Sequence, residues 1–383
     1  MLDHPAPEDE DNIMAALKQS DRVSSISLTV TSSLLEKLSA IKGPFSQLED
    51  LVLLSRDSVQ LTLPSYFQWG PRLRSLQLTG IVFPELLQRI SSSRDLVDIQ
   101  LHLYEGSHKD GLSPEAFANV LSGMPRLQSL SLHFPPTAID ISPFSPSGER
   151  VILPVLTRLN FRGLTEYLED LVARIDAPRL GDIEITFSNI LLVCDVPRLR
   201  EFIDRIEMQK LHHRADILFS ERAVSLSLTQ PGVPTCLKLQ VICKTLRLQP
   251  FCMAQISSHF SAFLFHVKDL RISMTRPSSR QNSGSRGQWL ELIRQFRGAK
   301  WFHVAGDHST NVAHALQLSI ERREAVLPAL HKLCIREPEP RYAPLREVVV
   351  PFVHSCWLSG HFIAVEYEIL WTNELRGTGT THT

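Results

Sequence analysis

The chain of 383 residues repeats one short segment, and this repeat restricts the possible folds more than any other feature of the sequence. Residues 71–80 read PRLRSLQLTG, and related segments begin at Pro125 (PRLQSLSLHF) and Pro178 (PRLGDIEITF). Each copy has three apolar residues in the same spacing, and the last two alternate with polar residues as in a half-buried strand. The triplets are Leu73, Leu76, Leu78; Leu127, Leu130, Leu132; and Leu180, Ile183, Ile185.

The distance between copies indicates a leucine-rich repeat. Leu73 and Leu127 are 54 residues apart, and Leu127 and Leu180 are 53 apart. Each step is close to twice ~27 residues, a period typical of leucine-rich repeats, so one further copy is expected in each interval. Those copies are present, and the register extends toward the N-terminus in steps of 25 residues. The added triplets are Leu96, Ile99, Leu101; Leu156, Leu159, Phe161; Val23, Ile26, Leu28; and Leu48, Leu51, Leu53.

The C-terminal half carries similar triplets at uneven steps. Its pattern predicts further strands, but their spacing does not define a constant period. The triplets are Ala223, Leu226, Leu228; Cys243, Leu246, Leu248; Val267, Leu270, Ile272; Ala299, Phe302, Val304; and Leu330, Leu333, Ile335.

The segments between these strands carry helix signals. Ser33 and Glu36 form a capping box, Ser113 with Pro114 predicts a helix that continues to Met124, and Thr165 begins another amphipathic segment. Alternating strands and helices favour a parallel sheet covered by helices. We therefore predict an α/β fold: a leucine-rich repeat solenoid of about 10–12 repeats, with the curved parallel sheet inside and helices outside.

The chain is predicted to be one repeat array with irregular parts. Residues 1–20 are expected to be an acidic, partly disordered leader in which only Ile13–Lys18 could be helical, and residues 21–371 to be the solenoid. An irregular insertion at 190–222 should contain a helix over Arg198–Met208 and an extra strand over Ala215–Phe219. Residues 276–288 are predicted to be a mobile loop, and residues 372–383 a disordered tail. A helix over Leu345–Leu358, kinked or divided at Pro351, and a strand over Phe362–Trp371 should form a C-terminal cap.

Composition indicates an intracellular protein. The net charge is -1 and 43% of residues are apolar, which is ordinary for a soluble domain. The six cysteines form no C-x-x-C pair and none precedes Cys194, so we interpret them as reduced thiols. The sequence shows neither a signal peptide nor a membrane span, and we predict a cytoplasmic or nuclear location.

No motif indicates an enzyme, and we predict no catalytic residue, cofactor site or metal site. Asp307-His308-Ser309 combines catalytic residue types, but members of a triad converge from different elements, so a turn before a helix explains them better. The segment from Arg276 to Lys300 contains six basic residues and one acidic residue. A solvated loop and helix face explains this charge, and nucleic-acid binding is not expected.

The candidate site is the face of the sheet opposite the buried triplets. Successive strand residues point to opposite faces, so the polar residues between apolar ones should line an exposed, rigid and chemically varied surface. Such a surface is suited to binding a protein; for any single residue, simple solvation is the alternative explanation. The candidate residues are Gln77, Gln100, Ser131, Asn160, Arg162 and Glu184.

From Ser20 to Trp371 the sequence resembles the leucine-rich repeat part of the F-box and leucine-rich repeat proteins of mushroom-type (basidiomycete) fungi. The segments that carry the resemblance are Asp21–Leu28, Pro178–Leu180, Pro197–Phe202 and Leu358–Tyr367. The resemblance implies a substrate receptor of a ubiquitin ligase. No F-box-like L-P-x-E-x-L helix precedes the first repeat, so adaptor binding is expected only if an F-box lies upstream of Met1. The alternative is a stand-alone scaffold or inhibitor of the ribonuclease-inhibitor type.

Overall fold

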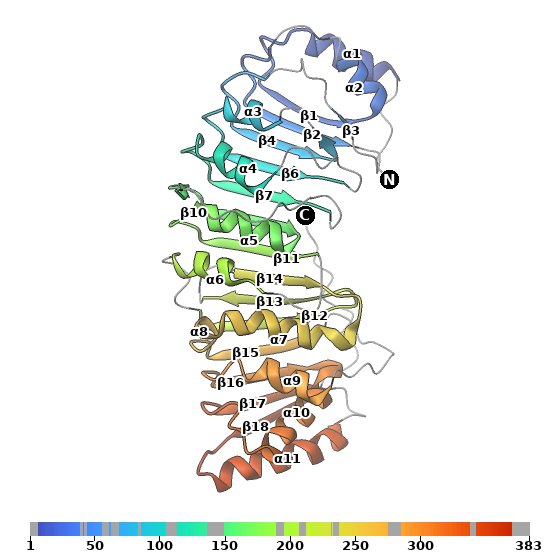
Figure 1. Ribbon diagram of the computed structural model, residues 1–383. Coiled ribbons are helices and arrows are strands. Elements are labelled where there is room, and N and C mark those ends of the chain that lie inside the picture. Colours follow the sequence, from blue (N-terminus) through green and yellow to red (C-terminus); the bar gives the residue numbers. More distant parts are fainter. Residues whose placement is uncertain are drawn as a thin grey trace. The chain divides into compact units, whose positions relative to one another are not determined.

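The chain forms two compact units (Figure 1). Unit 1 contains Met1–Asn189 and Glu201–Met208, and unit 2 contains Ile190–Arg200 and Gln209–Thr383. The division falls within the insertion expected at 190–222 and passes through helix α6 (Pro197–Asp204), which begins with a further Pro-Arg-Leu sequence. The computed structural model describes residues 7–38, 41, 44–55, 61–62, 69–82, 86–104, 113–135, 149–188, 195–206, 212–230, 232, 237–274, 285–337 and 342–369.

Unit 1 is built on a parallel sheet with the strand order β1-β2-β4-β6-β7-β9-β11. Two short parallel pairs, β3 with β5 and β8 with β10, lie beside it. The strands are β1 (Ser25–Val30), β2 (Asp50–Ser55), β3 (Leu61–Thr62), β4 (Ser75–Thr79), β5 (Ile81–Val82), β6 (Asp98–His102), β7 (Ser129–His133), β8 (Val151–Ile152), β9 (Arg158–Gly163), β10 (Ile175–Asp176) and β11 (Asp182–Phe187). The helices are α1 (Pro7–Leu17), α2 (Ser32–Leu38), α3 (Leu86–Ser91), α4 (Pro114–Leu121) and α5 (Thr165–Arg174).

The predicted triplets form the core of unit 1. Leu76, Ile99 and Leu130 lie opposite one another on adjacent strands, and each is at most 1% exposed. Because the triplets repeat at a nearly constant step, equivalent apolar residues stack across the whole sheet and exclude water from one of its faces.

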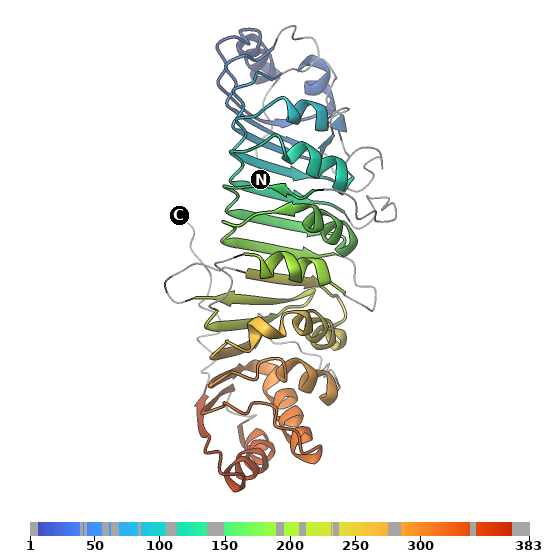
Figure 2. The same ribbon diagram turned by 60° about the vertical axis from the view of Figure 1, so that its left-hand side comes forward.

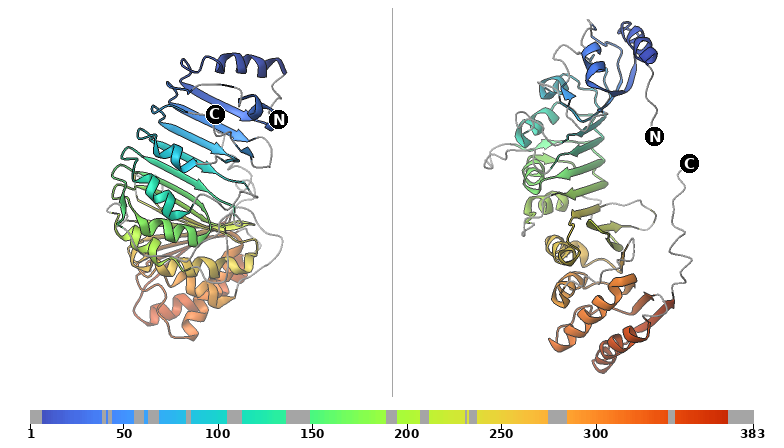
Figure 3. Two further views of the ribbon diagram at one scale, coloured as in Figure 1. Left: turned by 45° about the horizontal axis from the view of Figure 1, so that its top comes forward. Right: turned by 90° about the vertical axis from the view of Figure 1, so that its right-hand side faces the viewer.

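Helices α3, α4 and α5 cover this apolar face (Figure 2). Helix α4 begins where the sequence predicts, since the Ser113 hydroxyl accepts a hydrogen bond from the Ala116 amide and Pro114 occupies the first turn. The α5 residue Tyr167 is fully buried, and its ring stacks on that of Phe161 of β9. No helix of the described part covers the opposite face of β4 to β11 (Figure 3), which we call the open face of unit 1.

Helix α1 is longer than the sequence suggests. It begins at Pro7, whereas Ile13–Lys18 was the only helical segment expected. Proline is favoured in a first helical turn because it has no amide to satisfy there, and an acidic run such as residues 8–11 is of the type favoured near helix N-termini by the helix dipole. This part of the sequence is therefore compatible with a helix start.

Unit 2 is built on a sheet with the strand order β14-β13-β12-β15-β16-β17-β18. Helices α7, α9 and α10 pack side by side over it, and α11 packs against α10. The strands are β12 (Arg214–Phe219), β13 (Ala223–Thr229), β14 (Leu237–Ile242), β15 (Asp269–Met274), β16 (Trp301–Ala305), β17 (Lys332–Glu337) and β18 (Ala364–Ile369). The helical segments are η2 (Leu246–Leu248), α7 (Gln249–His259), α8 (Ser261–Leu264), α9 (Arg286–Ile293), η3 (Gly306–His308), α10 (Ser309–Glu321) and α11 (Tyr342–Leu358).

The expectation of an entirely parallel sheet is wrong for unit 2. Strand β13 is antiparallel to both β12 and β14, while β12 pairs with β15 in parallel. Only residues 220–222 separate β12 from β13, and a connection this short can join only antiparallel neighbours. The Ser220 hydroxyl accepts a hydrogen bond from the Ala223 amide and donates one to the Ala223 carbonyl, which closes the hairpin.

Two further predictions in this region need correction. The triplet at Cys243, Leu246 and Leu248 is not a strand, because Leu246–Leu248 is a 3-10 turn that leads directly into α7. The loop predicted at 276–288 ends earlier than expected. Ser285 and Gln288 form a capping box that starts α9 at Arg286, and residues 275–284 lie outside the described part, as do 370–383.

The C-terminal elements agree with the predicted helix and strand. Helix α11 continues through Pro351 and is not divided there, and β18 pairs with β17 in parallel. The α/β class and the parallel sheets with helices on one face are thus confirmed, with the exception of β13. The repeat solenoid, its curvature and its repeat number remain predictions.

Candidate functional site

The sequence candidates lie together on the open face of unit 1. Gln77, Gln100, Ser131, Asn160 and Glu184 are direct neighbours on β4, β6, β7, β9 and β11, and we call them the central row. All five are half-buried, and Arg162 lies exposed on the same face two residues beyond Asn160. The row exists because equivalent residues of a repeat fall in register when the strands are parallel.

Neighbouring side chains hold parts of this row in place. The Gln100 amide donates a hydrogen bond to the Asp98 carboxylate at 2.8 Å. The Asn160 oxygen lies 3.3 Å from Nε2 of His133. Side chains fixed in this way lose less conformational entropy when a partner binds, so the face is partly preorganised.

A histidine stack lies beside the central row, and sequence reasoning did not single it out. The rings of His102 and His133 are 3.9 Å apart between centroids and are nearly parallel, with an angle of 8°. Their strands place them directly opposite each other, so the shared register was the signal that could have found the pair. Burial, and secondly the charge of His133, lower the pKa of His102 from 6.5 to about 4.

This pKa predicts that acid destabilises unit 1. His102 is protonated more readily in the unfolded chain, so its stabilising contribution is complete above pH 6.5 and is lost as the pH falls through about 4. Between about pH 7.5 and about pH 4.5, the wild type should lose on the order of 1 kcal/mol more unfolding free energy than His102→Gln, since half-burial leaves some screening by solvent. Urea titrations at both pH values measure the difference. His354→Gln, at an exposed histidine, should follow the wild type, and parallel pH profiles for all three proteins would contradict the assignment.

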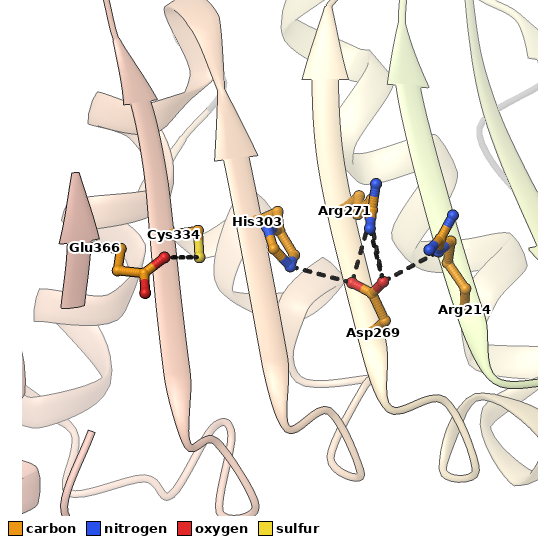
Figure 4. Close-up of polar contacts among 6 residues, drawn as sticks. All are labelled: Arg214, Asp269, Arg271, His303, Cys334 and Glu366. Atoms are coloured by element: carbon orange, nitrogen blue, oxygen red, sulfur yellow. Dashed lines mark hydrogen bonds and ion pairs between the residues drawn. The ribbon is translucent and has the colours of Figure 1, made fainter. Parts of the chain in front are cut away.

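The face of the unit 2 sheet opposite the buried Leu270 and Ile272, which we call the open face of unit 2, carries a charge network (Figure 4). The sequence analysis did not identify this network. Its centre is Asp269 of β15, whose side chain is only 11% exposed. Nε of Arg214 on β12 donates to this carboxylate at 3.0 Å, Nη2 of Arg271 on β15 donates at 3.0 Å, and Nε2 of His303 on β16 lies 3.4 Å away. One carboxylate thus contacts two arginines and a histidine that come from three strands.

The same face continues to the last two strands. Nζ of Lys332 on β17 lies 2.6 Å from the Glu366 carboxylate of β18, and Nε of Arg336 lies 2.5 Å from that of Glu368. The Cys334 thiol donates to Glu366 at 3.6 Å. Oppositely charged side chains therefore pair between β12 and β15 and again between β17 and β18 on this face.

The cysteine thiols of this unit with shifted pKa values are weak nucleophiles. Burial is the main cause of the raised pKa of the Cys334 thiol, and burial also raises the pKa of Cys356, so both favour the protonated, weakly nucleophilic form. Within the described ranges, no three His, Cys, Asp or Glu side chains are placed to hold a metal ion. His308 ends the turn η3 and Ser309 begins α10, as expected for the Asp307-His308-Ser309 segment.

The sequence was compared with protein-family models and with curated proteins. Neither a protein-family model nor a curated protein matches the sequence. Among the described helices, none combines the length and the apolar character that crossing a membrane requires.

Proposed function

We propose that the chain is a non-enzymatic protein-binding module and that the open face of unit 1 contacts its partner. The observation that carries the proposal is the central row, in which polar side chains from five adjacent strands share one uncovered face. Amides, a hydroxyl and a carboxylate in one row offer both donors and acceptors, which gives a surface chemical specificity.

The dimensions of this face favour a protein over a small ligand. Seven parallel strands ~4.8 Å apart span ~29 Å, and the face is a sheet surface, whereas small ligands prefer concave, mostly apolar pockets. A standard protein interface uses ~20–30 residues on each side, which a face of this width can supply.

The finer proposal is a leucine-rich repeat solenoid of the F-box and leucine-rich repeat type. Repeated parallel strands at steps near ~27 residues support the repeat. On this proposal the chain acts as the substrate-recognition part of a ubiquitin-ligase receptor. A stand-alone scaffold or inhibitor would use the same face without ubiquitin transfer.

Site-specific photocrosslinking tests the binding face. A photoreactive phenylalanine analogue at Gln100 should give one dominant protein adduct in an extract of the source cells. The same analogue at Asn119, an exposed residue of α4 on the helix side, should not. Adding Asn160→Arg should reduce the Gln100 adduct, because a polar group buried in an interface without its partner costs about 1 to 3 kcal/mol, or roughly 5-fold to 150-fold in affinity. Adducts from Asn119 alone would contradict the proposal.

A purified ubiquitin-ligase adaptor separates the two finer functions. The chain beginning at Met1 is expected to show no micromolar binding to the adaptor, because no F-box-like motif precedes the first predicted strand. Binding at micromolar or lower Kd would mean that these residues themselves contain an adaptor site. The crosslinking result does not depend on this outcome.

A further inference from the structure

Strand β18 presents an unpaired edge of the unit 2 sheet. It pairs with β17 along Ala364–Ile369, and no strand of the described part pairs with its other edge. A strand edge carries backbone donors and acceptors that can bind a further strand. Charged side chains can protect such an edge, so the edge alone does not identify a ligand.

The charges on β18 indicate what kind of strand would fit. Glu366 and Glu368 project from the same face, since they alternate with Val365 and Tyr367, and their side chains are 52% and 47% exposed. We call this pair the acidic edge. Lys332 and Arg336 contact it from β17, which is on one side only.

Asp269 of β15 is an example of a carboxylate on this sheet that is contacted by side chains of both neighbouring strands. It accepts from Arg214 on one neighbouring strand and lies within ion-pair distance of His303 on the other. A carboxylate has about four lone-pair positions, so one cation does not saturate it. By the same geometry, Glu366 and Glu368 can each accept a second cation from a strand added beside β18.

Exposed apolar side chains lie shortly before β18 in the chain. Trp357 and Leu358 end helix α11, Phe362 lies two residues before β18, and they are 56%, 74% and 71% exposed. Val350, two helical turns before Trp357, is 51% exposed. Several large apolar residues that remain exposed in one segment are typical of a docking surface.

Pairing of β18 with a second copy of itself is electrostatically unfavourable. In a two-fold antiparallel pair, residues on the same face lie directly opposite each other. If Glu366 or Glu368 of one copy lies opposite Glu366 or Glu368 of the other, two glutamates face each other across the strand pair. Like charges directly opposite each other are destabilising.

We propose that the β18 edge captures an extended segment of a partner protein that carries Lys or Arg at alternate positions. The added strand would extend the sheet through backbone hydrogen bonds. Its basic side chains would contact the acidic edge, and its neighbouring apolar regions would cover Trp357, Leu358 and Phe362. This site is separate from the open face of unit 1 and does not depend on the function proposed for that face.

Fluorescence anisotropy with designed peptides tests the proposal on the full chain. The probe is a labelled peptide of alternating lysine and valine with lysine at both ends. One control has the same composition with all lysines first, and another has N-methylated valine amides, which removes backbone donors but keeps every charge. Only the alternating, unmethylated peptide should bind well, with at least about tenfold lower Kd than either control.

Variants then locate the site. Glu366→Gln with Glu368→Gln should weaken binding of the alternating peptide at least about tenfold, whereas Glu321→Gln with Glu324→Gln, which changes the net charge equally at exposed sites, should not. Circular dichroism checks that each variant is folded. Equal binding of all peptides, or unchanged binding to the Glu366/Glu368 variant, would overturn the proposal. So would a concentration-dependent dimer in sedimentation equilibrium that Tyr367→Pro abolishes, since that result identifies a second copy as the occupant.

Discussion

Leu130→Ala is expected to lower the free energy of unfolding of unit 1 by about 2 to 5 kcal/mol, the range for removing a buried leucine side chain. Leu130 is 1% exposed and lies between Ile99 and Leu159 of the neighbouring strands. Truncation therefore leaves a cavity in the middle of the apolar ladder, where two flanking strands limit how far the core can collapse.

The matched control is Ser131→Ala, one residue further along the same strand. Ser131 faces the open side of the sheet, so its replacement should change the unfolding free energy by less than about 0.5 kcal/mol. Urea unfolding followed by circular dichroism measures both variants against the wild type. The transition in which unit 1 unfolds should shift with Leu130→Ala and stay in place with Ser131→Ala. Equal losses for the two variants would mean that the faces of β7 are reversed.

The second large effect is expected at Asp269. Asp269→Asn keeps the shape of the side chain but removes the negative charge that Arg214 and Arg271 contact and that lies 3.4 Å from His303. A hydrogen bond to a charged group contributes about 1.5 to 3 kcal/mol. The exposure of both arginines and the hydrogen bonds that the amide oxygen of Asn can still accept reduce the loss, so we expect about 1 to 2 kcal/mol.

Asp216→Asn provides the isosteric comparison on the neighbouring strand. Asp216 lies opposite Arg271, but burial outweighs the nearby cations and raises the pKa of its carboxyl group. The folded protein thus disfavours the ionised form of Asp216, and a neutral amide should be tolerated with a change of less than about 0.5 kcal/mol. Chemical denaturation near neutral pH measures the free energy of unfolding of both variants. A larger loss for Asp216→Asn than for Asp269→Asn would contradict the conclusion that Asp269 is the centre of the network.

Where repeat spacing is constant, the sequence predicts the strands well. The triplets at Leu76, Leu130 and Ile183 are buried, and their polar neighbours form the central row, because a period-two pattern defines the faces of a strand without reference to the rest of the fold. Helix starts were also predictable where a cap is local, as at Ser113. The start of α1 at Pro7 was missed because the acidic run at residues 8–11 was interpreted as a partly disordered leader, although acidic residues are favoured near helix N-termini.

Interactions between distant segments could not be predicted in the same way. Strand β12 pairs with β13 through a short hairpin and with β15 across 55 residues between Arg214 and Asp269, and no constant step connects these strands. The Asp269 network and the acidic edge of β18 both depend on which strands become neighbours in unit 2.

The sequence by itself therefore determined the α/β class, the buried face of each regular strand and the residues of the central row, because these follow from local periodicity. Only the tertiary structure decided the antiparallel hairpin, the His102–His133 stack, the three-strand contacts of Asp269 and the position of β18 at an edge. The physical reason is that strand faces are set by alternation along one segment. Which strands become neighbours in a sheet depends on the loops that connect them and on the packing of their apolar faces. Both involve residues far apart in the chain.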